Sequence, residues 1–144
     1  MRRRDFVGLV AGATVVWPLG ARAQQATRIP RVGILVPGRA EGPDASRAAF
    51  NAMIEGLQEL GYTEGQNIVF ERRFGDSNPD RLRQAAAELV ERQVDVIVAQ
   101  STTAALPAKQ ATSQIPIVAM GMADPVEDGL VASLARPGGN LTGT

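Results

Sequence analysis

Residues 94–107 read V-D-V-I-V-A-Q-S-T-T-A-A-L-P, and this stretch decides the fold. Its first part is a short β-rich apolar run, typical of a strand buried on both faces, and its last part has the composition of a helix. Between them lie Gln100, Ser101, Thr102 and Thr103. A strand that restarts as a helix presents free backbone N–H groups at its carboxyl end, where open α/β sheets usually bind ligands. The alternative is that Ser101 or Thr102 only caps the helix.

Strands and helices alternate along the rest of the chain, with short connections. This alternation predicts right-handed crossovers and a parallel sheet covered on both faces, an α/β doubly wound fold. The first strand is expected in the centre and the polar second strand at an edge, which gives the strand order 2-1-3-4-5. Strands are predicted at 32–36, 67–74, 94–99, 115–120 and 140–144, and helices at 45–60, from 78 or 80 to 90, from 104 to 111, and at 127–135.

The ends of the predicted helices carry capping signals. Asp44 or Ser46 is a candidate cap at the start of the first helix, and Gly61 after Leu60 fits a left-handed cap at its end. Asn78 or Asp80 is expected to begin the second helix.

Three loops converge at the carboxyl ends of the first, third and fourth strands in this order. They carry Gly38 and Arg39, the polar residues 100–103, and Asp124. The N–H groups and hydroxyls of 101–103 would attract a carboxylate, helped by the helix dipole. Asp124 is expected either to receive an ammonium or to cap the following helix, and Arg39 either to reach an anion or to remain solvated. Met120 and Met122 are predicted to be packing residues.

Several chemistries lack the residues they need. The chain has no histidine and no cysteine, which leaves no Ser-His-Asp arrangement, no histidine or thiolate metal site and no disulfide. Its only lysine, Lys109, lies within a predicted helix, and there is no phosphate-binding G-x-x-x-x-G-K-[S/T] loop or G-x-G-x-x-G turn. Pro37 and Gln100 stand where a phospho-acceptor domain would want acids. We therefore predict a binding protein rather than an enzyme, without catalytic residues, metal or cofactor.

The first 23 residues are predicted to be an export signal. Three arginines precede a short apolar run, and A-R-A at 21–23 gives small residues where a signal peptidase reads them. The run is shorter than the ~20 residues that span a bilayer. Arg3-Arg4 suits a twin-arginine signal, and a general secretory route remains open. We expect cleavage after Ala23 and a periplasmic location.

Charge is balanced overall but unevenly spread. The chain has 15 Lys and Arg against 15 Asp and Glu; residues 1–23 hold four of the bases and one acid, so the remainder has 11 bases, 14 acids and a net charge of −3. A mildly acidic body without a basic stripe argues against a nucleic-acid partner.

Five segments carry a resemblance to a known family. They are I-P-R-V-G-I-L from Ile29, A-F-N-A-M-I-E-G-L-Q-E-L-G-Y-T-E-G-Q-N-I-V-F-E from Ala49, A-A-E-L-V-E-R-Q-V-D-V-I-V-A from Ala86, A-A-L-P-A-K-Q-A-T-S-Q-I-P-I-V from Ala104, and A-D-P-V-E-D-G-L-V-A-S-L-A-R-P-G-G-N-L-T-G from Ala123. Together they resemble the N-terminal half of the ABC-transporter substrate-binding proteins that include tryptophan- and other amino-acid-binding members.

The resemblance implies a two-lobed periplasmic-binding-protein fold that closes on a small zwitterionic or polar solute and delivers it to an ABC permease in the inner membrane. The loops at Pro37, at 101–103 and at Asp124 would then form one wall of the cleft. The family's ligand-binding positions correspond directly to Ser101, Thr102 and Asp124, and less closely to Gly38 and Arg39.

Family members run to roughly twice this length, as two ordinary domains require. Residues 24–144 are therefore expected to be an N-terminal lobe, truncated before the second lobe. We expect it to bind weakly, because a closing cleft draws affinity from both sides.

Two other classes remain as alternatives. The effector-binding core of a transcriptional regulator shares the sheet topology, but it needs a basic helix-turn-helix where this chain has its apolar run. A small secreted α/β enzyme using Ser101 or Asp124 needs a base, and there is no histidine to serve as one.

Overall fold

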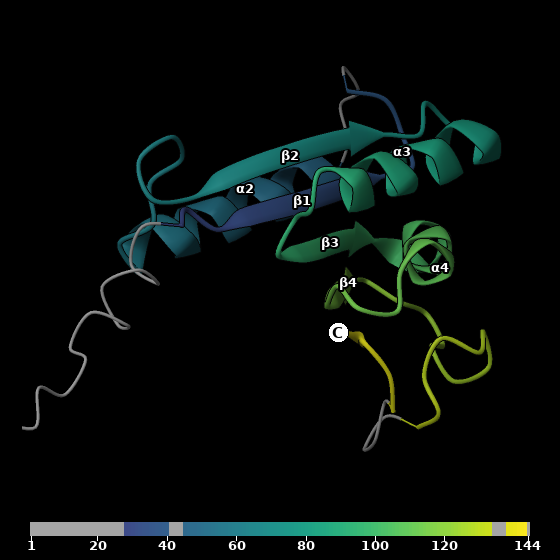
Figure 1. Cartoon of the computed structure of the whole chain (residues 1–144). Helices are drawn as coiled ribbons and strands as arrows, with labels where there is room; N and C mark the ends of the chain where they lie inside the picture. Colours follow the sequence, from purple (N-terminus) through teal and green to yellow (C-terminus); the bar gives the residue numbers. More distant parts are fainter. Residues whose placement is uncertain (1–27, 41–44, 134–137, 144) are drawn as a thin grey trace, which may run out of the picture.

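The computed structural model describes residues 28–40, 45–133 and 138–143, with the side chains of 45 and 46 outside it. The element labels are those of Figure 1. In chain order, the elements are β1 (Arg31–Val36), α2 (Ala45–Glu59), β2 (Val69–Phe74), α3 (Pro79–Glu91), β3 (Val96–Gln100), α4 (Ser101–Ala111), β4 (Ile117–Met120) and β5 (Leu141–Gly143).

The five strands form one parallel sheet in the order β2-β1-β3-β4-β5, which confirms the predicted fold class and strand order. The register places Val32 between Phe70 of β2 and Val96 of β3. Helices α3 and α4 cover one face of the sheet, and α2 lies on the other (Figure 1). The carboxyl ends of β1, β3 and β4 therefore meet at one rim, as the strand order requires.

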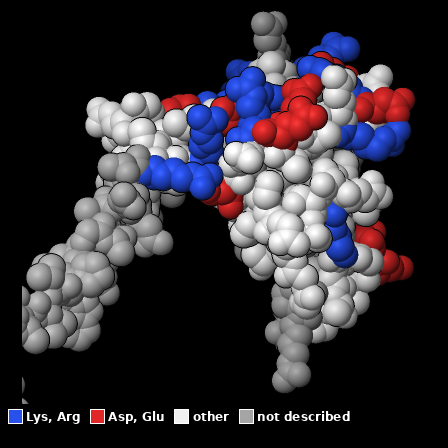
Figure 2. Space-filling model, viewed as in Figure 1, with Lys and Arg blue, Asp and Glu red and all other residues white. Residues whose placement is uncertain are grey.

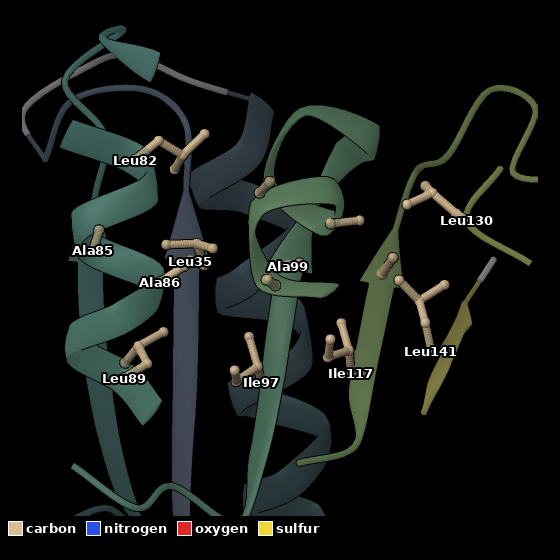
Figure 3. Packing of buried hydrophobic residues seen from close by; sticks show 14 of the residues in the cluster. Leu35, Leu82, Ala85, Ala86, Leu89, Ile97, Ala99, Ile117, Leu130 and Leu141 are labelled. Atoms are coloured by element: carbon tan, nitrogen blue, oxygen red, sulfur yellow. The ribbon is translucent and has the colours of Figure 1, made fainter. Parts of the chain in front are cut away.

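The larger core lies on the α3 and α4 side. Leu35, Ile97 and Ile117 project from neighbouring strands toward Leu89 of α3 and the alanines of α4, and all of them are fully buried. Figure 3 shows the leucines and alanines of α3 directed at the sheet. The small, fully buried alanines of α4 let that helix pack closely against the strands.

The smaller core lies under α2. Phe50 of this helix packs with alternate residues of β1 and β2, including Ile34 and Phe70, and with Val98 of β3. On β4 the same face is less covered, because Val118 is 37% exposed whereas its neighbour Ile117 is fully buried.

The ends of α2 and α3 follow the sequence signals. Gly61 has a φ of 91°, and the N–H groups of Gly61 and Tyr62 donate to the carbonyls of Gln58 and Leu57, the hydrogen-bond pattern of a left-handed glycine cap. Asn78 is the N-cap of α3, where its side chain accepts from the N–H groups of Asp80 and Arg81. The caps predicted at Asp44 and Ser46 lie outside the described side chains.

The helix predicted over 127–135 is wrong for its described part. Residues 125–130 form a turn in which the N–H groups of Leu130 and Val131 both donate to Pro125 O. Gly129 adopts a φ of 69°, which ends any right-handed helical path, and Leu130 and Val131 then enter the core. Lys109 Nζ donates to the carbonyls of Gly129 and Leu130 and ties the turn to α4.

Smaller differences concern element ends. The second strand begins at Val69 rather than 67, the third ends at Gln100, and the fourth begins at Ile117 with Pro116 before it. The export signal predicted over 1–23 lies outside the described residues. None of the helices in the described ranges has the length and apolar content that a bilayer crossing requires.

Candidate functional site

The junction between β3 and α4 differs from its sequence-based description. Helix α4 begins at Ser101 rather than Ala104, and Gln100 is its N-cap residue without a side-chain capping bond. The alternative that Ser101 or Thr102 merely caps the helix is therefore wrong. Ser101 has a φ of 62°, a left-handed conformation that is uncommon for a residue other than glycine. Such backbone outliers cost about 1–3 kcal/mol and concentrate at functional sites.

Thr102 carries a second unusual feature at the same junction. Its Oγ1 is buried, and within the described part of the chain it has no hydrogen-bond partner. The first N–H groups of any α-helix also lack partners inside the helix, and here Gln100 gives them no side-chain acceptor. The junction thus combines the backbone donors of a helix start with a buried, unpaired hydroxyl at the carboxyl rim of the sheet, and a helix start suits an anionic oxygen.

Asp124 lies on the neighbouring loop. Gln100 pairs with Met120 at the end of β4, and Gly121, with a φ of 70°, then turns the chain toward Asp124. Asp124 is exposed, and its Oδ1 accepts from the N–H of Glu127 at 2.9 Å, so it caps a turn. Met120 and Met122 pack against the two cores, as predicted.

The loop after β1 divides between two hollows. Pro37 O and Gly38 O accept from the N–H groups of Ser77 and Asp76, which binds this loop to the one that follows β2. Pro37 and Thr103 line a hollow of about 310 Å³ between α3 and α4. Arg39 lines a different hollow, of about 250 Å³, on the α2 side. The structure therefore keeps 100–103 together at the rim, and groups Arg39 with residues of α2 and β2 instead.

Charged side chains are concentrated away from the junction. Figure 2 shows them gathered over β2 and α3, with few over α4 and β4. There the half-buried Glu71 lies 3.5–3.8 Å from Arg31, Arg73 and Arg92. Residues 100–107 contain no charged side chain, so the helix dipole and backbone N–H groups dominate the field at the junction. Among the described residues, no group of three or more His, Cys, Asp or Glu side chains could hold a metal ion.

Three features of these sites were not predicted from the sequence. The left-handed Ser101 and the unpaired Thr102 hydroxyl depend on how α4 docks on the sheet, and no residue type signals either. The arginines that join Arg39 at its hollow, Arg47 and Arg72, come from α2 and β2. The alternation of side chains along β2 gave one signal for Arg72, because it places Arg72 on the same side of the strand as Phe70 and Phe74.

Comparison with known proteins gives a consistent picture. Residues 32–144 match the family model described as ABC transporter substrate binding protein. A relative named tyrosine-binding protein, from Clostridioides difficile (strain R20291), is 38% identical over 104 residues, which cover 72% of this chain and 30% of the relative.

Solved structures agree on the fold. The ligand-free, open structure of a substrate-binding protein with adhesive properties from Clostridium difficile superposes with a TM-score of 0.71 at 30% identity, over 80% of this chain and 38% of that one. An ABC domain in complex with L-Trp from Streptococcus pneumonia gives 0.73 at 25% identity, over 81% and 38%. A solute-binding protein from Rhodopseudomonas palustris in complex with 3,4-dihydroxy benzoic acid gives 0.57 at 26%, over 79% and 31%. The chain spans 30–38% of the length of these four proteins.

Proposed function

The chain belongs to the ABC transporter substrate-binding protein family, and we propose that it provides one wall of a site that binds an amino-acid-like solute for import. In this proposal the solute meets the β3–α4 junction outside the cytoplasm and passes to a permease in the inner membrane. The export signal predicted over 1–23 remains a prediction of the sequence.

The unpaired Thr102 hydroxyl beside a left-handed Ser101 is the observation that carries the proposal. A buried hydroxyl without a partner costs about 1–3 kcal/mol, and a φ above zero at serine adds backbone strain. A ligand oxygen that accepts hydrogen bonds at the junction would offset both costs. A carboxylate would accept from the N–H groups of 101–103 and from Thr102 Oγ1, and the positive end of the α4 dipole would favour its charge.

Asp124 is proposed to receive the ammonium group of the same ligand. Its Oδ1 already accepts from the Glu127 N–H, but an ionised carboxylate has about four lone-pair sites and can accept further bonds. Gln100, which is half-buried at the end of β3, is proposed to contribute its side-chain amide to the same ligand. The names of two relatives, a tyrosine-binding protein and a complex with L-Trp, support an aromatic amino acid as the solute.

Substitution of Thr102 by valine tests the proposal. Calorimetric titration of the full chain with L-tyrosine and L-tryptophan should detect binding in the millimolar range, equivalent to about 4 kcal/mol, because the described residues form one wall of the proposed closing cleft. Thr102→Val should weaken this binding about tenfold, while its free energy of unfolding stays equal or rises, because the lost hydroxyl had no partner.

Thr142→Val, at an exposed threonine of β5, is the matched control and should leave binding unchanged. Equal affinity in Thr102→Val and the unaltered chain would contradict the proposed site. A clear fall in stability in Thr102→Val would show instead that the hydroxyl has a structural role.

A further inference from the structure

We propose that the hollow on the α2 side of the sheet is a second ligand site, which takes a small aromatic carboxylate. It measures about 250 Å³ and is bounded by α2, the ends of β1 and β2, and residues 39–40. The site is separate from the proposed amino-acid site, because no residue of the β3–α4 junction lines it.

The side chains that line the hollow come from one face of α2, one side of β2 and the end of β1. Arg47, Phe50 and Asn51 are spaced three and four residues apart, which places them on one face of α2. Arg72 and Phe74 alternate along β2 and therefore share one side of the strand. The floor is made by β1 side chains that are almost fully buried. An apolar floor with two phenylalanines offers a surface on which an aromatic ring can stack.

The charges around this hollow are unbalanced. Arg39, Arg47 and Arg72 all line it, and no acidic side chain does so among the described residues. Arg72 is neutralised by Glu64 through hydrogen bonds of 2.7 and 3.1 Å. Arg47 donates to the backbone carbonyl of Ala40, an uncharged acceptor, and in the described ranges no ion pair involves Arg39 or Arg47. Among the residues that the structure describes, the guanidinium groups of Arg39 and Arg47 therefore have no acidic partner beside this apolar surface.

Arg72 is fixed in place as well as neutralised. Its guanidinium carbon lies 5.3 Å from the centroid of the Phe70 ring, within the range of a cation–π contact. A guanidinium carries five N–H donors, and the Glu64 carboxylate uses two of them. This arginine can thus orient a ligand by hydrogen bonding without adding net charge.

The ligand class follows from this combination. Guanidinium groups bind carboxylates with paired hydrogen bonds, and the phenylalanines favour a ring over an aliphatic chain. Pockets for drug-sized ligands usually measure ~300–1,000 Å³, so a hollow of about 250 Å³ suits a molecule with a single ring. An α-amino acid is disfavoured, since its ammonium would meet two arginines and, among the described lining residues, no carboxylate. This distinguishes the hollow from the junction, where Asp124 is proposed to receive an ammonium.

Two ligands that differ by one ammonium group give a direct test. The full chain, labelled with ¹⁵N, is titrated with 3-phenylpropionate, with L-phenylalanine and with inorganic phosphate, and amide shifts are followed. We expect 3-phenylpropionate to shift the amides of 47–54 and 72–74 with millimolar affinity. L-phenylalanine should bind this hollow at least tenfold more weakly, and so should phosphate, which has no ring.

A double variant then tests the arginines. Arg39→Gln with Arg47→Gln should weaken 3-phenylpropionate binding at least tenfold and leave any binding of L-tyrosine at the junction unchanged. Arg28→Gln is the control, at an exposed arginine that pairs with Asp95 and lies before β1, at the opposite end of the sheet.

Several results would overturn the proposal. These are equal affinities for 3-phenylpropionate and L-phenylalanine, equal affinities for 3-phenylpropionate and phosphate, shifts confined to 100–103, or unchanged binding by the double variant. Should the double variant fold poorly, the ligand comparison on the unaltered chain still decides the matter. The test is also independent of the amino-acid site, because the two sites report through different amides.

Discussion

On β4, Ile117 is fully buried against α4, whereas the next residue, Val118, is 37% exposed on the opposite face of the sheet. This contrast extends across the molecule. The α3 and α4 side has a continuous core from Leu35 to Leu141, while the α2 side has a smaller core centred on β1 and β2. Parallel sheets are ordinarily covered on both faces, so the described chain completes one face and only part of the other.

The two faces also differ in what they can do. The closely packed face holds the start of α4 in a costly backbone conformation at Ser101, which only a well-determined surrounding can maintain. The less covered face contains the hollow lined by Arg39, Arg47 and Arg72. A rigid face thus supports the proposed amino-acid site, and a looser face leaves room for the second ligand.

The largest expected effect on stability comes from comparing two neighbouring residues of β4 that lie on opposite faces of the sheet. Ile117→Ala should lower the free energy of unfolding by about 3 kcal/mol, because it removes three buried carbons and leaves a cavity. Val118→Ala should cost less than about 1 kcal/mol, since much of that side chain already contacts water. Urea unfolding of both variants measures the difference. Equal losses would mean that Val118 is covered in solution and that the contrast between the faces is wrong.

A smaller effect is expected where the turn at 125–130 is tied to the packed face. Lys109 Nζ donates to the carbonyls of Gly129 and Leu130 at 2.9 and 2.8 Å. Lys109→Met keeps the aliphatic stem but removes these charge-assisted bonds, and should cost about 1.5 kcal/mol. Hydrogen exchange should rise at the N–H groups of Leu130 and Val131.

The neighbouring exposed Gln110 provides the control for this prediction. Gln110→Met should change stability by less than about 0.5 kcal/mol. If Lys109→Met left exchange at Leu130 unaltered, the turn would be held by its own hydrogen bonds to Pro125 and not by the lysine.

Regular features of the fold were predictable because they depend on local pattern. The alternation of strand and helix gave the parallel sheet, and the polar second strand indicated an edge position. Gly61 gave the end of α2 because a left-handed cap needs a residue without Cβ. The helix expected after 127 failed for the same kind of reason, since Gly129 also adopts a left-handed conformation and turns Leu130 into the core.

The unusual features were not predictable because they depend on packing between distant segments. Serine has no sequence preference that would mark φ above zero at residue 101. Thr102 loses its partners only when α4 docks on the sheet. The arginine-lined hollow needs α2, β2 and the loop after β1 together, so the sequence suggested a role for Arg39 without indicating its neighbours Arg47 and Arg72.

The smallest expected effect concerns the ion pair beside the hollow on the α2 side. The hydrogen bond from Arg72 holds the pKa of the Glu64 carboxyl below its ordinary value, against the opposing effect of burial and with a lesser contribution from the charge of Arg72. A carboxyl with a lowered pKa in the folded state stabilises the protein above its unfolded pKa. This contribution should be lost as pH falls from about 5 through the lowered value. Arg72 stays charged throughout, because the pair raises its pKa further.

Glu64→Gln measures that contribution. Because 38% of the Arg72 side chain and 44% of the Glu64 side chain are exposed, the pair should contribute no more than about 1 kcal/mol at neutral pH, less than the Lys109 bonds. The difference in the free energy of unfolding between the unaltered chain and Glu64→Gln should shrink toward pH 3, which is about one unit below the pKa of a free glutamate. It should also shrink in high salt, which screens exposed pairs. A difference that stayed constant with pH would show that Glu64 acts through its shape and not its charge. In that case Arg72 would not be neutralised by Glu64, and the hollow would be lined by a third arginine without an acidic partner among the described residues.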